Sequence, residues 1–146
     1  MRDLLFRAKR TDNGEWAEGS YVHLYLNRHY IFTGKLDLTQ HNYKGRIGFE
    51  CFEVNPETVG QYTGVNDFNG AKIFEGDIVQ FSLIECHGCH GIKQFGCVEF
   101  YAGEFYMVFA SGEETFMSSL SDDDYIYEIV GNIYDNPGTL KTKENR

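Results

Sequence analysis

The stretch "GQYTGVNDFNGAKIFEGDIVQF", residues 60–81, decides the fold expected for this chain, because two tight turns interrupt its short apolar runs. The first turn is predicted at 67–70, where an Asn-Gly pair tolerates positive φ angles. In the second, Gly76 is expected to supply a positive φ and Asp77 to accept hydrogen bonds from nearby backbone N–H groups. Beyond it, apolar and polar residues alternate over 79–83, as in a half-buried strand. The stretch therefore predicts strands joined by tight turns.

Similar signals continue beyond this stretch. Two strands joined by a turn at 102–104 are predicted, with Tyr106 and Val108 of the second strand facing a core. The segment 125–138 predicts either a last strand pair or one strand with a bulge at Gly131. Because no apolar repeat of helical period extends over a helix of ordinary length, roughly eight to ten short strands account for the chain.

The composition agrees with strands and turns. Hydrophobic residues make up 42%, which excludes a disordered chain, and 12 Phe, 10 Tyr and 16 Gly against 2 Pro favour strands over helices. The 146 residues fit one domain or two small ones. We expect an all-β fold, with an N-terminal β-rich part at 1–65, a C-terminal SH3-like small barrel at 66–136, and a tail at 137–146.

The charge balance narrows the class of partner. The chain has 22 acidic and 13 basic residues, a formal net charge of -9. This excess disfavours nucleic-acid binding, which usually relies on a basic surface to displace phosphate counterions, and it suits a basic protein partner. The sequence shows no signal peptide and no apolar run of about 20 residues, so we expect a cytoplasmic protein that does not span a membrane. In that compartment its cysteines should be thiols or metal ligands.

The central stretch resembles the YopX proteins, which are found in bacteriophages and prophages of Gram-positive bacteria. Members carry a segment close to Q-Y-T-G-L-x-D-x-N-G-x-x-I-Y-E-G-D-I-V, where this chain has Val65 for the Leu and Phe74 for the Tyr. The matching residues are Gln61, Tyr62, Thr63, Gly64, Asp67, Asn69, Gly70, Ile73, Glu75, Gly76, Asp77, Ile78 and Val79. The opening "MRDLLFRAKR" and the closing "EIVGNIYDNPGTL" also resemble the family's two ends. The resemblance implies a mostly β fold and a phage or prophage origin, and it implies no known reaction.

The segment "ECHGCHG" at 85–91 lies outside those family motifs and contains a C-x-x-C-H pattern. Haem attached in this way needs a further axial ligand and is added outside the cytosol, so we interpret the match as chance. A structural zinc ion needs four ligands, and the candidates are Cys86, Cys89, His90 and Cys97, unless a second subunit supplies one. We predict a loop of free thiols without a cofactor, and zinc remains the alternative.

No residue pattern indicates catalysis. Glu75 and Asp77 share a face in extended chain, but the sequence places no partner beside them, so turn formation explains them better than acid–base chemistry. Cys89 and His90 point apart in extended chain, which disfavours a nucleophile and base pair. Since phosphate-loop and hydrolase motifs are also missing, we predict that the protein is not an enzyme.

Other chemically notable side chains are interpreted as ordinary ones. The basic cluster at 7–10 is expected to be a solvated face rather than a phosphate site. It consists of Arg7, Lys9 and Arg10. We expect Trp16, Tyr21 and Tyr25 to cover a sheet rather than to stack on single-stranded nucleic acid. Cys51 is interpreted, like Cys97, as a small core residue.

These observations favour a binding module over an enzyme. We predict that the protein binds a protein partner of basic character through loops and exposed strand edges. Two alternatives remain, a nucleic-acid-binding protein with a local basic groove and a zinc-stabilised interaction domain. Exposed strand edges and the many aromatic residues also make a homo-oligomer a prediction to test.

Overall fold

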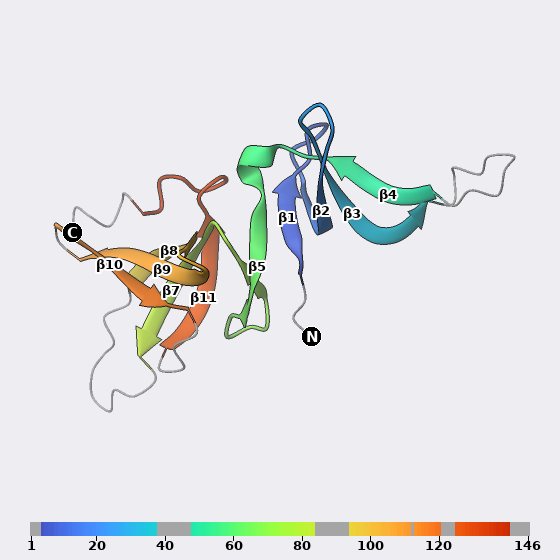
Figure 1. The fold of residues 1–146 in the computed structure, drawn as a ribbon. Coiled ribbons are helices and arrows are strands. Elements are labelled where there is room, and N and C mark those ends of the chain that lie inside the picture. Colours follow the sequence, from blue (N-terminus) through green and yellow to red (C-terminus); the bar gives the residue numbers. More distant parts are fainter. Residues whose placement is uncertain (1–3, 38–47, 84–93, 112, 121–124, 141–146) are drawn as a thin grey trace, which may run out of the picture. The chain divides into compact units, whose positions relative to one another are not determined.

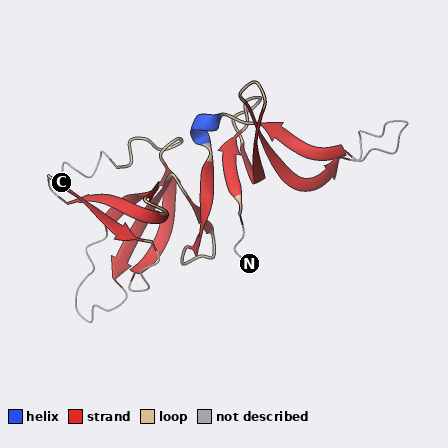
Figure 2. Cartoon of the chain, viewed as in Figure 1, coloured by secondary structure: helices blue, strands red, loops and turns tan. Residues whose placement is uncertain are grey.

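The computed structural model describes residues 4–37, 48–83, 94–111, 113–120 and 125–140. Within them the regular structure is almost entirely β, with one short 3₁₀ helix (Figure 2). The expected all-β class is therefore confirmed. The chain divides into two compact units, Met1–Tyr62 and Thr63–Arg146, and the boundary falls inside strand β5 (Figure 1). The domain limits predicted from the sequence stay a prediction, because compactness does not show which part folds alone.

The N-terminal unit is an antiparallel sheet with the strand order β4-β3-β2-β1-β5. Its elements are β1 (Phe6–Lys9), β2 (Trp16–Leu24), β3 (Arg28–Asp37), β4 (Gly48–Glu53), the 3₁₀ helix η1 (Pro56–Thr58) and β5 (Gly60–Asn66). An Asn-Pro pair ends β4, as such a pair should: Pro56 begins η1, and the side chain of Asn55 accepts a hydrogen bond from Glu57 N.

The sheet of the N-terminal unit curls around a small core. The end of β4 lies beside the end of β1, because Thr11 N donates to Glu53 O at 3.0 Å and Asn55 N donates to Lys9 O at 2.8 Å. Two alanines in the core let the strands curl tightly, since larger side chains would not fit inside the bend. The buried members of this core are Ala8, Ala17, Ile31 and Val54.

The C-terminal unit contains a five-stranded antiparallel sheet with the order β10-β9-β8-β7-β11, while β6 pairs with the end of β5. Its strands are β6 (Lys72–Phe74), β7 (Asp77–Leu83), β8 (Gln94–Tyr101), β9 (Glu104–Ser111), β10 (Glu114–Ser119) and β11 (Tyr125–Asn132). The pairing of β11 with β7 shifts register between Ile129 and Gly131, which confirms the bulge predicted there.

A second core covers one face of this sheet. Gly96 makes room for it, because a Cβ atom there would lie 2.5 Å from Cγ of the fully buried Met107. Burial of a side chain of this size contributes about 1.5–3 kcal/mol to folding. The buried members of this core are Ile73, Val79, Phe81, Val98, Phe105, Met107, Leu120 and Tyr127.

The face of β9 that points to this core differs from the expectation. Phe105 and Met107 are buried, whereas Tyr106 and Val108, which were predicted to face the core, lie on the opposite face. The β8–β9 turn explains the difference, because Ala102 has a φ of 51° and the glycine after it a φ of 88°, as in a two-residue hairpin turn. That turn places Met107 opposite the buried Val98, so the two share a face.

The C-terminal strands form an open sheet rather than the closed SH3-like barrel expected at 66–136. In the described residues, β10 and β11 lie at opposite ends of the sheet. The outer edge of β11 binds a turn instead of a strand, since Phe68 N donates to Tyr127 O at 2.9 Å. That turn occupies the edge that barrel closure needs. The described residues also include no helix with the length and apolar character that a membrane crossing requires.

Candidate binding surface

The turn at 67–70 is held by one buried carboxylate. Oδ1 of Asp67 accepts hydrogen bonds from Asn69 N and Ala71 N, both at 2.9 Å, and Oδ2 accepts from Ile129 N at 3.2 Å. Gly70 N donates to Asp67 O at 3.0 Å and completes the predicted turn. Asp67 therefore closes the turn and fastens it to β11. Its two carboxylate oxygens are thus occupied by hydrogen bonds from backbone N–H groups.

The Glu-Gly-Asp turn is built in the same way. Gly76 has a φ of 87°, and a Cβ atom there would lie 3.0 Å from the ring of Tyr134. Asp77 is fully buried, and its Oδ2 accepts a hydrogen bond from Phe74 N at 2.8 Å. Both roles predicted for this turn, the positive φ and the acceptor for a backbone N–H group, are confirmed. The carboxylate of Asp77 thus supports the backbone between β6 and β7.

The segment after β11 closes onto the Glu-Gly-Asp turn. Ile133 N donates to Gly76 O at 2.9 Å. Oδ1 of Asn132 accepts from Tyr134 N at 3.0 Å and from Asp135 N at 2.9 Å, which fixes the chain reversal. The carboxylates of Asp67 and Asp77 and the amide oxygen of Asn132 are therefore engaged with backbone N–H groups.

The net charge is concentrated in one unit. Residues 1–62 contain eight Lys and Arg against eight Asp and Glu, so this unit is formally neutral. Residues 63–146 contain five Lys and Arg against fourteen Asp and Glu, which accounts for the whole net charge of -9. Among the described residues of the C-terminal unit, Lys72 is the one basic residue. The negative charge of the chain is therefore a property of the C-terminal unit.

Part of this charge lies on the outer face of β8, β9 and β10, among tyrosines. Glu99 pairs with Tyr106 and Tyr101 pairs with Glu104, and residues that are opposite each other in a ladder share a face. Ser119 lies opposite Tyr106 on the next strand. We call these five residues the acidic–tyrosine surface. Both glutamates are exposed, and Tyr101 is 66% exposed.

Hydrogen bonds order part of the acidic–tyrosine surface. The Tyr106 hydroxyl donates to Oε2 of Glu104 at 3.2 Å, and the Ser119 hydroxyl donates to Oε1 of the same carboxylate. The hydrogen bond to Glu104 raises the pKa of Tyr106, so the phenol stays a neutral donor. Carboxylates beside ring faces suit the ammonium group of Lys and the guanidinium group of Arg. Sequence reasoning missed this surface, although its two glutamates and two tyrosines stand symmetrically about the two-residue turn at 102–103.

Comparison with known proteins agrees with this architecture. The family described as YopX protein matches residues 5–141, nearly the whole chain. The chain belongs to the YopX protein family. Its structure is similar to the crystal structure of protein EF1440 from Enterococcus faecalis, with a TM-score of 0.58 and 22% identity, over 96% of this chain and 99% of that chain. At that identity the likeness shows the shared fold. A search of curated proteins finds no match.

Three of the four candidate zinc ligands of this YopX family protein, Cys86, Cys89 and His90, lie outside the described residues. The fourth, Cys97, is buried on β8, as predicted for a core residue. Burial, with nearby carboxylates, raises the pKa of its thiol to about 12. A cysteine that binds zinc has to be a thiolate. The raised pKa keeps the Cys97 thiol protonated and therefore disfavours its binding to a metal ion. Both the zinc site and the loop of free thiols stay predictions.

The other cysteine assigned to the core was placed wrongly. Cys51 is exposed on β4. Side chains alternate along this strand, and Phe52 points to the core, so its neighbour in sequence has to point away. The sequence alone could have predicted the exposure of Cys51 only if Phe52 had first been assigned to the core.

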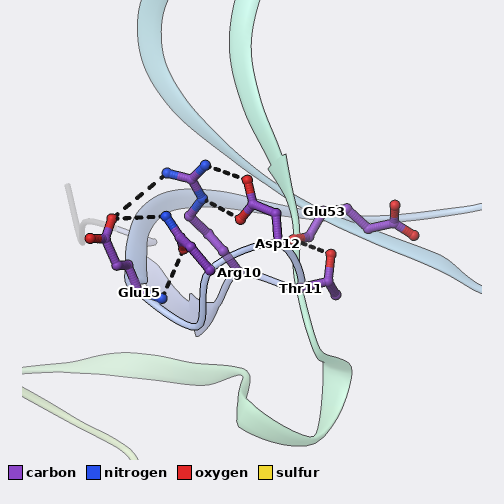
Figure 3. A network of polar contacts seen from close by, with 6 residues as sticks. Arg10, Thr11, Asp12, Glu15 and Glu53 are labelled. Atoms are coloured by element: carbon purple, nitrogen blue, oxygen red, sulfur yellow. Dashed lines mark hydrogen bonds and ion pairs between the residues drawn. The ribbon is translucent and has the colours of Figure 1, made fainter.

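The predicted basic cluster of this family member packs on aromatic rings. Arg7 lies 4.7 Å and Lys9 lies 5.4 Å from the ring centre of Trp16, and Arg10 lies 3.8 Å from that of Phe52. Figure 3 shows that Arg10 is also paired with Asp12, through Nε at 2.9 Å and through Nη2. The Arg10 guanidinium lowers the pKa of that carboxyl group. These cations are thus half-buried rather than fully solvated, and Arg10 is neutralised by its own neighbour.

The three aromatic residues considered as a stacking platform are not brought together. Trp16 lies opposite Lys9 on one face of the sheet, while Tyr21 packs on the core at the other face. Tyr25 lies in the turn after β2 and is 89% exposed. Tyr21 instead places its hydroxyl 2.6 Å from Nδ1 of the buried His29. Residues five apart on a strand point to opposite faces, which explains the separation of Trp16 from Tyr21.

Proposed function

We propose that this YopX family protein acts as a binding module, and that its C-terminal unit binds a basic protein on the acidic–tyrosine surface. The observation that carries the proposal is the concentration of the whole net charge of -9 in residues 63–146. Two of the fourteen acidic residues of this unit, Glu99 and Glu104, are exposed beside Tyr101 on one face of one sheet, which supports the choice of this surface.

The chemistry of the surface favours several weak contacts acting together. An exposed ion pair contributes about 0.2–1 kcal/mol, and a cation over an exposed tyrosine ring contributes about 0.5–1 kcal/mol. Micromolar binding requires about 8 kcal/mol, so the partner must bring several Lys or Arg side chains and apolar contacts as well. Because the charges are exposed, association should become slower as salt rises.

The test uses the full chain immobilised and exposed to a lysate, with bound proteins identified by mass spectrometry. We expect basic proteins to be retained at low salt by the wild type and lost on the double change Glu99→Lys and Glu104→Lys. The matched control changes Glu57→Lys and Glu128→Lys, two exposed acids outside the surface, and alters the net charge equally. An identical set of proteins on both double variants would falsify the proposal.

The nucleic-acid alternative would use the N-terminal unit. The N-terminal unit has no negative excess, and Arg7 and Lys9 lie over Trp16 there. If this alternative holds, a gel shift with single-stranded DNA or RNA appears at low salt and disappears on the double change Arg7→Glu and Lys9→Glu. The zinc alternative is tested by the zinc content of the purified chain and of a Cys86→Ser variant.

A further inference from the structure

Strand β10 is an edge strand with little of the usual protection. It is at one end of the five-stranded sheet, and no described strand pairs with its outer edge (Figure 1). Edge strands are commonly protected from pairing by charged side chains, above all Lys, by Pro, by a bulge or by very short length. The sequence of β10, Glu-Thr-Phe-Met-Ser-Ser, has six residues, contains neither Lys nor Pro, and carries a single charge, on its first residue Glu114. Its pairing with β9 is also regular, without a bulge.

The other described sheet edges differ from β10. The outer edge of β11 is bonded to the turn that Asp67 holds, since Tyr127 O accepts from Phe68 N and Ile129 N donates to Oδ2 of Asp67. The end of β4 is bonded to the end of β1. Strand β6 has only three residues. Strand β10 is therefore the described edge best suited to pair with another strand.

A row of aromatic rings leads across the sheet to this edge. Tyr125 and Phe81 have ring centres 5.6 Å apart, Phe81 and Phe109 are 5.0 Å apart, and Phe109 and Phe116 are 5.6 Å apart. Strand β8 lies between Phe81 and Phe109 and has Gln94 opposite Phe81, yet the two rings contact each other across it, beside Gly96, which has no side chain. The row ends on β10 at Phe116, which is 41% exposed. Among the described residues, the ring contacts of the row end at Phe116.

We propose that two copies of this chain pair through their β10 strands, antiparallel, with Phe116 opposite Phe116 of the second copy. A two-fold axis perpendicular to the sheet keeps the core face of both copies on the same side, so opposite residues must share a face. Centring the axis on Phe116 continues the aromatic row from one copy into the other.

The charges of the strand support this register. With Phe116 on the axis, Glu114 lies opposite Ser118 of the second copy and Thr115 lies opposite Met117 of the second copy. No like charges are then directly opposite. A register centred on Glu114 would place two carboxylates opposite each other, which is destabilising. The edge is therefore self-complementary in the register centred on Phe116.

The register is tested by the mass of the full chain in solution, measured by light scattering. The wild type is expected at twice the chain mass of 16.8 kDa. Phe116→Lys and Phe116→Glu are each expected to be monomeric, because like charges meet across the axis. An equimolar mixture of the two variants is expected to regain the dimer mass, since opposite charges then meet. The matched control is Phe100→Lys, a 50% exposed phenylalanine on β8, away from the edge.

A wild-type chain that stays monomeric at high concentration overturns the proposal, and so does a dimer that survives both charged variants. A mixture that stays monomeric overturns the register. Thermal melting shows whether each variant is folded. If the charged variants fail to fold, Phe116→Cys supplies the test, because opposite Cα atoms in a ladder lie about 4.5–5.5 Å apart, within disulfide reach. Mild oxidation should give a cross-linked dimer through position 116, and the absence of one overturns the proposal.

Discussion

Replacing Asp67 with alanine should lower the stability of the C-terminal unit more than any substitution of an exposed side chain does. The carboxylate accepts three backbone hydrogen bonds, two within the turn and one from Ile129 of β11. Asn69 and Ala71 are exposed, so water can replace the carboxylate at their N–H groups. Ile129 is half-buried, and its N–H group would lose its partner where water has less access.

These hydrogen bonds set the size of the effect. The two rehydrated donors contribute about 1 kcal/mol each, and the half-buried donor, which bonds a charged acceptor, contributes about 2 kcal/mol. The expected loss is therefore about 4 kcal/mol in the free energy of unfolding. For a unit of this size, 1 kcal/mol corresponds to about 4–8 °C in melting temperature, so the loss corresponds to roughly 15–30 °C.

Urea unfolding followed by far-ultraviolet circular dichroism measures this loss. Asp67→Asn keeps one side-chain oxygen as an acceptor, so we expect it to lose about half as much stability as the alanine variant. Glu128→Ala removes an exposed carboxylate from β11 and controls for the change in charge. The role assigned to Asp67 would be refuted if the free energy of unfolding of Asp67→Ala lay within about 1 kcal/mol of the wild-type value, instead of about 4 kcal/mol below it.

Three further predictions concern turns, thiols and the acidic–tyrosine surface. Gly76→Ala should cost about 1–3 kcal/mol in urea unfolding, because a side chain at a φ of 87° is strained, and Gly138→Ala, with open space around it, should cost little. The pKa of Cys97 is about 12 in the folded state and about 9 in the unfolded chain, so the folded state keeps the proton over this range. The stability that this contributes is present below pH 9 and should be lost as the pH rises to 12. Urea unfolding measured against pH should show a smaller loss for Cys97→Ala. Glu104→Gln should lower the pKa of Tyr106 toward its ordinary value in an NMR pH titration.

Turns were predictable from the sequence because their causes are local. The positive φ of Gly76, the acceptor role of Asp77 and the bulge at Gly131 follow from residues within a few positions of each other. The membership of the YopX family could be inferred for the same reason, since its motif is a run of turn residues between short strands. Local signals of this kind do not depend on how the strands pair.

The features that were mispredicted all depend on strand pairing. The face of β9 that carries Met107 is set by a two-residue turn, and one residue more in that turn would have exposed it. The sheet does not close into a barrel, since the edge of β11 is occupied by Phe68 N, which donates to Tyr127 O, 59 positions further along the chain. The exposure of Cys51 depends on which face of β4 packs on a core made mostly of other strands. Periodicity alone gives no information about these choices.

Pairing through β10 would also change how the acidic–tyrosine surface binds. The two-fold axis proposed above is perpendicular to the sheet, so the surfaces of both copies would lie on the same side of one continuous sheet. Ser119 on β10 belongs to this surface, so each surface reaches the strand that forms the dimer contact. A partner with two basic segments would then contact both copies at once.

Such a dimer should bind an immobilised basic protein more tightly than a monomer does. Linking two sites raises the apparent affinity by about 10²–10⁴-fold without a new contact. Phe116→Lys should therefore weaken binding to a densely coated surface, while binding to the same protein free in solution, measured per site, stays near that of the wild type. The double change Glu99→Lys and Glu104→Lys should weaken both. Equal losses for Phe116→Lys in the two formats would mean that the edge strand contacts the partner itself.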